Sequence, residues 1–229
     1  MTRTILLLSL LAACGGGTAG GDDDTTPDAG SLPQGSLFPL VIDATWTYQV
    51  TDVSTNVVEQ KSQTVEALED VGGDKAGITA YRLRTEKAGG GYTISWQEDT
   101  GDAVIRHREQ NFDSLDAMQM DSYFVPSKLR VDQSDAHVAD GAAWDDSYQE
   151  QNHDIVAGTT ITADKVDHWT VMASVESVTV PAGTFTALHV HRTNSVTFSD
   201  KQYWFVPGVG KVKETGDSQI ELLSDYTIP

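Results

Sequence analysis

Hydrophobic and polar residues alternate along most of the chain from Thr45 onward, with the two-residue period of β-strands. At the start of this region Trp46, Tyr48 and Val50 fall on one face of such a strand, and the threonines and glutamine between them fall on the other. Similar runs, rich in β-branched and aromatic residues, predict further strands. They cover residues 57–68, 78–86, 92–97, 103–109, 123–131, 166–180 and 220–228.

Residues 175–214 show the pattern most clearly, because short turn sequences divide their apolar runs. Pro181-Ala182-Gly183 and Pro207-Gly208-Val209-Gly210 separate segments that alternate in the manner of strands. Proline gives no N–H to a strand ladder, and glycine tolerates positive φ, so the chain can reverse at both places. The segment therefore predicts an antiparallel β-meander with Gly183 and Gly208 at positive φ.

The whole pattern predicts one mainly β domain over residues 37–229, built as a single curved antiparallel sheet resembling a half-barrel. At most one or two short helices are expected; the best candidate is residues 111–120, where Phe112, Leu115 and Met118 lie three apart. Residues 132–146 hold five aspartates and predict a surface loop around Trp144. The side chains expected in the core are Trp46, Tyr48, Trp96, Trp169, Leu188, Val190 and Trp204.

The amino-terminal residues form a secretory leader that ends on the single cysteine of the chain. Arg3 precedes an apolar run that is too short to span a bilayer, and Leu11-Ala12-Ala13 leads directly to Cys14. This motif resembles the lipobox of bacterial lipoproteins, which implies cleavage before Cys14 and its attachment to lipid. A lone cysteine cannot form an internal disulfide, and lipid attachment explains its presence in an exported chain. An ordinary signal peptide with an incidental cysteine is the alternative.

Residues 14–36 predict a tether between this anchor and the domain. They are rich in Gly, Asp and Pro and hold no aromatic residue, so they bury too little surface to order themselves. A Gly-rich coil of this length reaches roughly 25 Å. The run Asp22-Asp23-Asp24 lacks the spaced oxygens and turn glycine of a calcium loop. Gly15, in place of an aspartate, favours the outer membrane under sorting that resembles that of enteric bacteria.

The net charge of the chain argues against some classes of binding partner. The chain carries a formal charge of −19, with 15 basic and 34 acidic residues. Nucleic acid and anionic lipid surfaces are bound through Lys and Arg, so neither is an expected partner. Contact with a membrane is instead expected through the lipid at Cys14. No cofactor is expected.

The strongest candidate for chemistry is His189-Val190-His191, because residues two apart on a strand point to the same face. Two such histidines can serve as ligands of a metal, with His168 as a third ligand and His107 or His153 as remoter ones. Leu188 and Val190 form the apolar face of the same strand, however, so both histidines can equally lie on its solvent face. No G-x-S-x-G motif occurs, and no catalytic residue is assigned.

Arg106 and Arg108 lie two apart in a predicted strand, so they are expected on one face. In a chain this acidic they are expected to pair with carboxylates across the sheet rather than with an anionic ligand.

Three motifs carry a resemblance to a known class of protein. They are Phe38-Pro39-Leu40 ahead of Trp46-Thr47-Tyr48, residues 178–185 (VTVPAGTF), and residues 204–212 (WFVPGVGKV). The chain resembles bacterial envelope lipoproteins with a curved antiparallel sheet, similar in plan to the LolA/LolB-like lipoprotein carriers. Those carriers hold acyl chains inside a half-barrel that helices close. This chain departs from them in having one helix candidate.

Three functions therefore stay open. The first is a non-enzymatic, lipid-anchored envelope protein whose sheet binds a partner protein or an apolar ligand. The second is a metal-assisted hydrolase with His189 and His191 as ligands. The third is a purely structural surface module. An apolar cavity on the concave face would favour the first, clustered histidines would favour the second, and a filled core with neither would favour the third.

Overall fold

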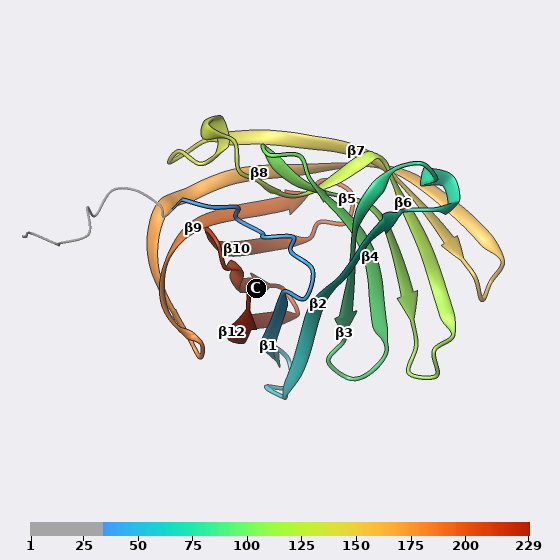
Figure 1. Cartoon of the computed structure of the whole chain (residues 1–229), viewed down its shortest axis with the longest axis horizontal. Helices are drawn as coiled ribbons and strands as arrows, with labels where there is room; N and C mark the ends of the chain where they lie inside the picture. Colours follow the sequence, from blue (N-terminus) through green and yellow to red (C-terminus); the bar gives the residue numbers. More distant parts are fainter. Residues whose placement is uncertain (1–33) are drawn as a thin grey trace, which may run out of the picture.

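The structure, a computed structural model, describes residues 34–229. The predicted leader, Cys14 and most of the predicted tether lie outside these residues. Twelve antiparallel strands follow one another around a closed barrel (Figure 1). The strands are β1 Thr45–Asp52, β2 Val58–Asp70, β3 Thr79–Glu86, β4 Tyr92–Asp99, β5 Ala103–Phe112, β6 Met118–Asp132, β7 Ala143–Asp154, β8 Thr159–Val180, β9 Gly183–Asn194, β10 Asp200–Val206, β11 Gly210–Gly216 and β12 Gln219–Thr227.

The curved antiparallel sheet predicted from the sequence is confirmed, and the sheet closes on itself. Each strand pairs with its neighbours in sequence, and β1 pairs with β12, from Thr45 opposite Thr227 to Asp52 opposite Gln219. The resemblance to LolA/LolB-like carriers implied closure by helices. Among residues 34–229 the helical elements are two short 3₁₀ turns, Gly73–Lys75 and Asp135–His137, and strand pairing performs the closure instead.

The apolar positions of the alternating pattern fill the core of the barrel. All seven side chains expected in the core are buried, and Trp46, Tyr48 and Leu188 are fully covered. Two of the seven are buried on the outer face instead of inside the barrel: Trp96, in a separate cluster, and Trp204, on the side of His189. Phe38 comes from the segment before β1 and stacks on Trp46 with ring centroids 5.2 Å apart. A fully buried side chain of this size contributes about 1.5–3 kcal/mol to folding.

The helix predicted over residues 111–120 is wrong. The chain makes a hairpin turn there, between β5 and β6. The Asp113 carboxylate accepts hydrogen bonds from the backbone N–H groups of Leu115 and Ala117, and Asp116 takes a φ of 62°. Aspartate favours such turns because its side chain competes for backbone N–H groups. Leu115, one of the three apolar residues with helical spacing, is 85% exposed.

The surface loop predicted over residues 132–146 is shorter than expected. It contains the 3₁₀ turn Asp135–His137, but Trp144 belongs to β7. The Trp144 ring stacks on His137, with centroids 4.2 Å apart, and lies parallel to Trp169 at 6.2 Å. The long strand predicted over residues 166–180 is confirmed as part of β8, with irregular pairing to β9 near Ala173.

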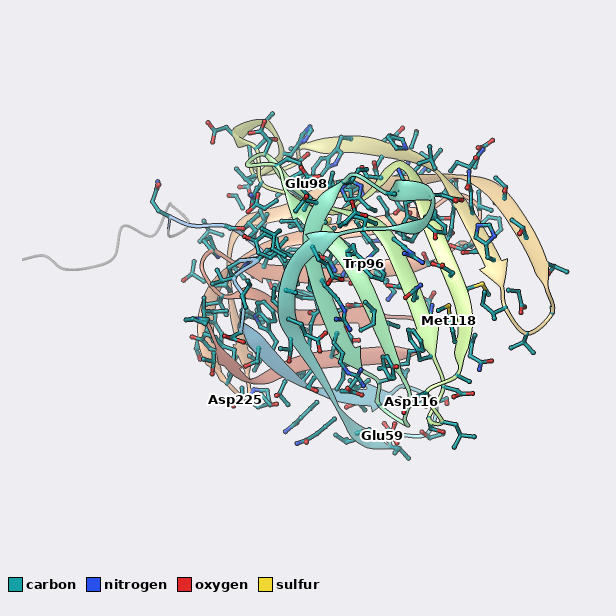
Figure 2. The ribbon with its side chains drawn as sticks, turned by 45° about the vertical axis from the view of Figure 1, so that its right-hand side comes forward. Glu59, Trp96, Glu98, Asp116, Met118 and Asp225 are labelled. Atoms are coloured by element: carbon teal, nitrogen blue, oxygen red, sulfur yellow. The ribbon has the colours of Figure 1, made fainter. Side chains whose placement is uncertain are left out.

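The two ends of the barrel differ. Since consecutive strands are antiparallel, the turns that follow odd-numbered strands all lie at one end, which we call the open end. Glu59, beside the β1–β2 turn, and Asp116, in the β5–β6 turn, lie at the same edge in Figure 2, whereas Glu98 lies at the opposite edge. The segment before β1 crosses the other end, where the Gly208 N–H donates to the carbonyl of Ser36.

No helix within residues 34–229 has the length and apolar character needed to cross a membrane.

Candidate functional site

The barrel interior is apolar toward the end that the segment before β1 crosses, and charged toward the open end. The charged part contains two adjoining cavities of about 340 and 270 Å³. The residues that line both of them are Lys61, Arg130, Lys211, Gln219 and Glu221. We call the two together the lumen cavity. The larger one reaches the β3–β4 turn through Lys87 and Ala88, and Phe38 lies on its wall.

Basic side chains are concentrated in the wall of the lumen cavity. Of the 15 Lys and Arg residues in the whole sequence, eight line it, against three of the 34 acidic residues. The eight are Lys61, Lys87, Arg106, Lys128, Arg130, Arg192, Lys201 and Lys211. The three acidic residues are Glu109, Glu214 and Glu221. The cavity wall is therefore strongly basic in a chain that is strongly acidic.

A chain of ion pairs crosses the cavity wall from β2 to β10. Glu221 accepts from Lys61 at 2.6 Å and from Lys211 at 2.7 Å. Glu214 pairs with Lys211 and, at 2.5 Å, with Lys201. Although burial acts to raise the pKa of each carboxyl, Lys211 and its neighbouring lysines hold the pKa of Glu214 well below its usual value, and lower that of Glu221. Both carboxylates are thus already engaged within the protein.

A β-bulge in β11 brings Lys211 and Glu214 to the same side of the sheet. Residues three apart on a regular strand face opposite sides. Here Trp204 of β10 pairs with Lys213 and Phe205 pairs with Lys211, so Val212 is an extra residue in β11. Lys211 and Glu214 therefore both reach the lumen.

Arg106 and Arg108 lie on opposite faces of the sheet, which contradicts the prediction that they share one. The pairing of β5 with β6 shifts between these two residues, because the ladder is irregular at this point. Arg106 lines the lumen cavity and pairs with Glu109. Arg108 forms a two-pronged ion pair with Asp121 and lies over the Trp96 ring, in a cluster on the outer face. The expected pairing with a carboxylate across the sheet is confirmed for Arg108, whereas Arg106 pairs with a carboxylate of its own strand.

Three of the basic side chains in the cavity wall, Lys87, Lys128 and Arg130, have no carboxylate partner among the described residues. Within residues 34–229, no carboxylate oxygen lies within ion-pair distance of Lys128 or Arg130. The Lys128 ammonium lies instead over the rings of Phe124 and Tyr148, at 5.4 and 5.1 Å. The Nε atoms of Arg106, Arg130 and Arg192 are buried and meet no acceptor among the described residues.

Burial and the excess of positive charge lower the pKa values of two lysines in the cavity wall. Burial, followed by repulsion from Lys211, lowers the pKa of Lys61 to about 8. Burial, followed by repulsion from Arg192, lowers the pKa of Lys128 to about 8 as well. Burial of an ammonium group without enough opposite charge favours its neutral form. The lumen cavity thus has unsatisfied positive charge.

The histidines predicted as metal ligands lie on the outer face of the barrel. His189 and His191 point away from Leu188 and Val190, which are buried in the core. The His189 ring bonds to Glu176 at 2.7 Å and to Gln202 at 2.8 Å, and it stacks on Trp204 at 4.1 Å. Each ring nitrogen of His189 therefore has a partner.

The other histidines are also separate from one another. His191 bonds to Asp200 at 2.8 Å, and the exposed His168 bonds to Asp145 at 2.6 Å. His107 bonds to Glu98 at 2.8 Å, and His153 to the hydroxyl of Thr160 at 2.9 Å. Within residues 34–229, no three His, Cys, Asp or Glu side chains are arranged to hold a metal ion.

The sequence contained a partial signal for the lumen cavity. Arg192 alternates with Leu188 and Val190, so a charge falls on the core face of β9. Glu221 alternates with Leu223, and Lys61 with Val65, in the same way. Charged residues in phase with a buried apolar face indicate a polar interior. Arg130 and Lys211 gave no such signal, because bulges place them.

No protein-family model and no curated protein matches the chain. Two solved structures are similar to it. One is a candidate exported protein with a YmcC-like fold from Bacteroides fragilis NCTC 9343, with 12% identity, a TM-score of 0.47, and coverage of 83% of this chain and 98% of that one. The other is a candidate lipoprotein from Parabacteroides distasonis ATCC 8503, with 11% identity, a TM-score of 0.41, and coverage of 86% and 100%.

Proposed function

We propose that this chain is a lipid-anchored protein of the bacterial cell envelope whose barrel binds a small polar molecule in the lumen cavity. The observation that carries the proposal is the cavity itself. The barrel wall encloses the cavity, which reaches the open end. Charged side chains line it, although the rest of the barrel interior is filled with apolar side chains. Its volume of about 340 Å³ falls within the range of small-molecule sites. A polar ligand replaces the apolar one expected from the sequence.

The anchor is proposed from the sequence. The apolar leader and the lipobox that ends at Cys14 support lipid attachment there, and outer-membrane sorting is supported by Gly15. Intact-mass analysis of the protein extracted from membranes should show an acylated amino terminus. A free Cys14 thiol, or membrane association that survives Cys14→Ser, would refute the anchor.

Binding is favoured over catalysis by the chemistry of the cavity. No histidine or cysteine is among the residues that line it, and its three glutamates are each held by a cation. General bases and nucleophiles need a group that is free to exchange a proton, and in this wall the lysines with a lowered pKa, Lys61 and Lys128, are the remaining candidates. A hydrolase that uses His189 and His191 is the less favoured alternative, because each histidine is held by its own carboxylate on the outer face.

A matched pair of variants tests binding in the lumen. Thr93 lines the cavity, so Thr93→Trp should fill it, whereas Thr179→Trp places the same ring on the exposed outer face of β8. Native mass spectrometry of the full-length protein should show a bound molecule that is lost in Thr93→Trp and kept in Thr179→Trp. Equal retention in both variants would refute binding in the lumen. So would a wild-type protein that carries no molecule and is stabilised by no member of a mixed set of charged and neutral metabolites.

A partner protein that docks at the open end is the second candidate. Large apolar side chains are exposed on four turns at that end: Val57, Leu115, Val156 and Phe198. Monomeric proteins rarely gather such side chains around one opening. A photo-crosslinker at Phe198 should yield one discrete adduct in cells, and a crosslinker at Val41, near the opposite end, should not. The absence of an adduct at Phe198, or the same adduct from both positions, would rule this candidate out.

A further inference from the structure

We infer that the ligand of the lumen cavity is a small organic polyanion, a molecule that carries at least two negative charges on phosphate or carboxylate groups. This inference rests on the proposed binding function and adds the chemical class of the ligand. It goes against the overall charge of the chain, which is −19. The positions of the charges within the barrel, and not the net charge of the chain, favour an anion in the lumen cavity.

The cavity wall carries more positive than negative charge. Eight basic side chains face three acidic ones, so the wall has an excess of five positive charges. Asp167 lies 3.6 Å from Arg192, and Asp146 of β7 pairs in register with Asp167, so these two carboxylates offset part of the excess and leave about three positive charges. Burying uncompensated charge is costly, and proteins usually pair or neutralise it. A bound anion with two or more charges supplies the neutralisation that the described residues do not.

Some cations of the cavity wall are free to bind an anion, and others are not. Lys61, Lys201 and Lys211 are occupied by Glu214 and Glu221. Lys128 and Arg130 have no carboxylate partner among the described residues, and they adjoin Arg192, whose Nε has no acceptor. Arginine presents a planar fork of N–H donors that fits phosphate and carboxylate oxygens. These three cations, of which only Arg192 also contacts a carboxylate, that of Asp167, form an anion site on one side of the cavity.

The uncharged residues of the larger cavity indicate the chemistry of the rest of the ligand. The larger cavity also has Phe38, Val50 and Ala88 in its wall, beside neutral polar side chains such as Thr85 and Gln63. A bare inorganic ion would leave these surfaces without contacts. A carbon skeleton with hydroxyl or amide groups would pack on the apolar residues and bond to the polar ones. A phosphorylated or polycarboxylated metabolite has both parts.

The experiment measures binding of four probes by isothermal titration calorimetry on the full-length protein in detergent. The probes are citrate, glucose 6-phosphate, inorganic phosphate and uncharged glucose. Citrate or glucose 6-phosphate should bind with one site per chain, more tightly than inorganic phosphate, and glucose should not bind. Lys128→Gln and Arg130→Gln should each weaken that binding by about tenfold or more, since each removes hydrogen bonds to a charged group.

The control is Lys213→Gln, which removes a lysine two positions from Lys211 but on the outer face, over the Trp204 ring. It should change the affinity by less than about twofold. Lys128 and Arg130 suit the test because no carboxylate is left unpaired when they are replaced. Thermal unfolding without ligand should confirm that all three variants fold.

The inference fails if no anion binds, if glucose binds as well as glucose 6-phosphate, or if Lys213→Gln weakens binding as much as Lys128→Gln. A tighter affinity for inorganic phosphate than for either organic anion would overturn the organic part. The proposed function can survive such a failure. A neutral molecule that is displaced by Thr93→Trp would support binding in the lumen and exclude the polyanion.

Discussion

Gly210, at the start of β11, shows how closely the turn after β10 is fitted to the core. Its φ is 109°, a conformation that side chains disfavour, and a Cβ there would lie 3.1 Å from Nε1 of Trp46. That same nitrogen donates to the carbonyl of Val209 at 2.6 Å. The positive φ predicted for Gly208 and Gly183 is confirmed, at 75° and 142°. At Gly208, however, no atom lies within 4 Å of an added Cβ.

These two glycines give a prediction about stability. Gly208→Ala should cost about 1–2 kcal/mol, the backbone penalty alone. Gly210→Ala should cost the same penalty plus about 1–3 kcal/mol, because the new methyl group pushes on the buried indole. Urea unfolding followed by tryptophan fluorescence measures both. Equal losses in the two variants would show that the contact with Trp46 is not tight.

The alternation of apolar and polar residues predicts the face of the sheet for some charged side chains in the lumen and not for others. Arg192 could have been placed inside the barrel, because it is in phase with Leu188 and Val190. Lys211 could not, because the extra residue Val212 changes the phase within β11. Alternation predicts the facing of a side chain only while the strand stays regular.

The strands were predicted well where apolar and polar residues alternate over a long stretch of sequence. The strands from Thr45 to Glu109 lie close to the expected ranges, since each has a buried face and glycine or aspartate turns beside it. The helix prediction over residues 111–120 is wrong because it relied on the helical spacing of three apolar residues. The turn preference of Asp113 and Asp116 decides the structure instead. Closure of the sheet could not be predicted, because pairing of β1 with β12 joins the two ends of the domain.

The segment before β1 acts as a plug for the end of the barrel that it crosses. Leu37, Phe38 and Leu40 are buried, while Val41 is 40% exposed in the same segment. Phe38 stacks on Trp46 and also lines the lumen cavity. The segment thus links the apolar core to the floor of the proposed site.

Two substitutions in this segment should differ sharply. Phe38→Ala should destabilise the protein by about 3–5 kcal/mol, because it removes a buried ring and leaves a cavity. Val41→Ala should change stability by less than about 0.5 kcal/mol, since its side chain is largely in solvent. Chemical denaturation provides both values. A loss below about 1 kcal/mol for Phe38→Ala would mean that the segment does not seal the barrel.

At the scale of the whole molecule, charge is sorted by location. Acidic residues dominate the exterior, and the lumen holds eight of the 15 basic residues of the sequence. The net charge of the chain argued against nucleic acid as an expected partner. It could not indicate a basic interior, because a net charge does not say where in the fold the charged residues lie. Only the closed sheet brings Lys61 of β2, Lys128 of β6 and Lys211 of β11 around one cavity.

The basic lumen predicts an unusual dependence of stability on pH. Lys61 and Lys128 have pKa values of about 8 in the folded protein, against an ordinary value of 10.5. Between these values the unfolded chain holds protons that the folded chain has released, so stability rises with pH. Below pH 8 both lysines are charged in the folded state, and their destabilising effect is complete. Above about pH 10 the trend reverses, because burial raises the pKa of Tyr203 to about 12 while unfolded tyrosines ionise.

Urea midpoints measured at constant ionic strength should therefore rise from about pH 8 to about pH 10 in the ligand-free protein. Lys128→Met removes one of the two lysines and should reduce the rise by about half, whereas Lys213→Met, on the outer face, should leave it unchanged. An organic polyanion that binds in the lumen should flatten the rise, because it favours the charged lysines in the folded state. A midpoint that falls throughout this range, or a rise that Lys128→Met leaves intact, would contradict the placement of uncompensated positive charge in the lumen.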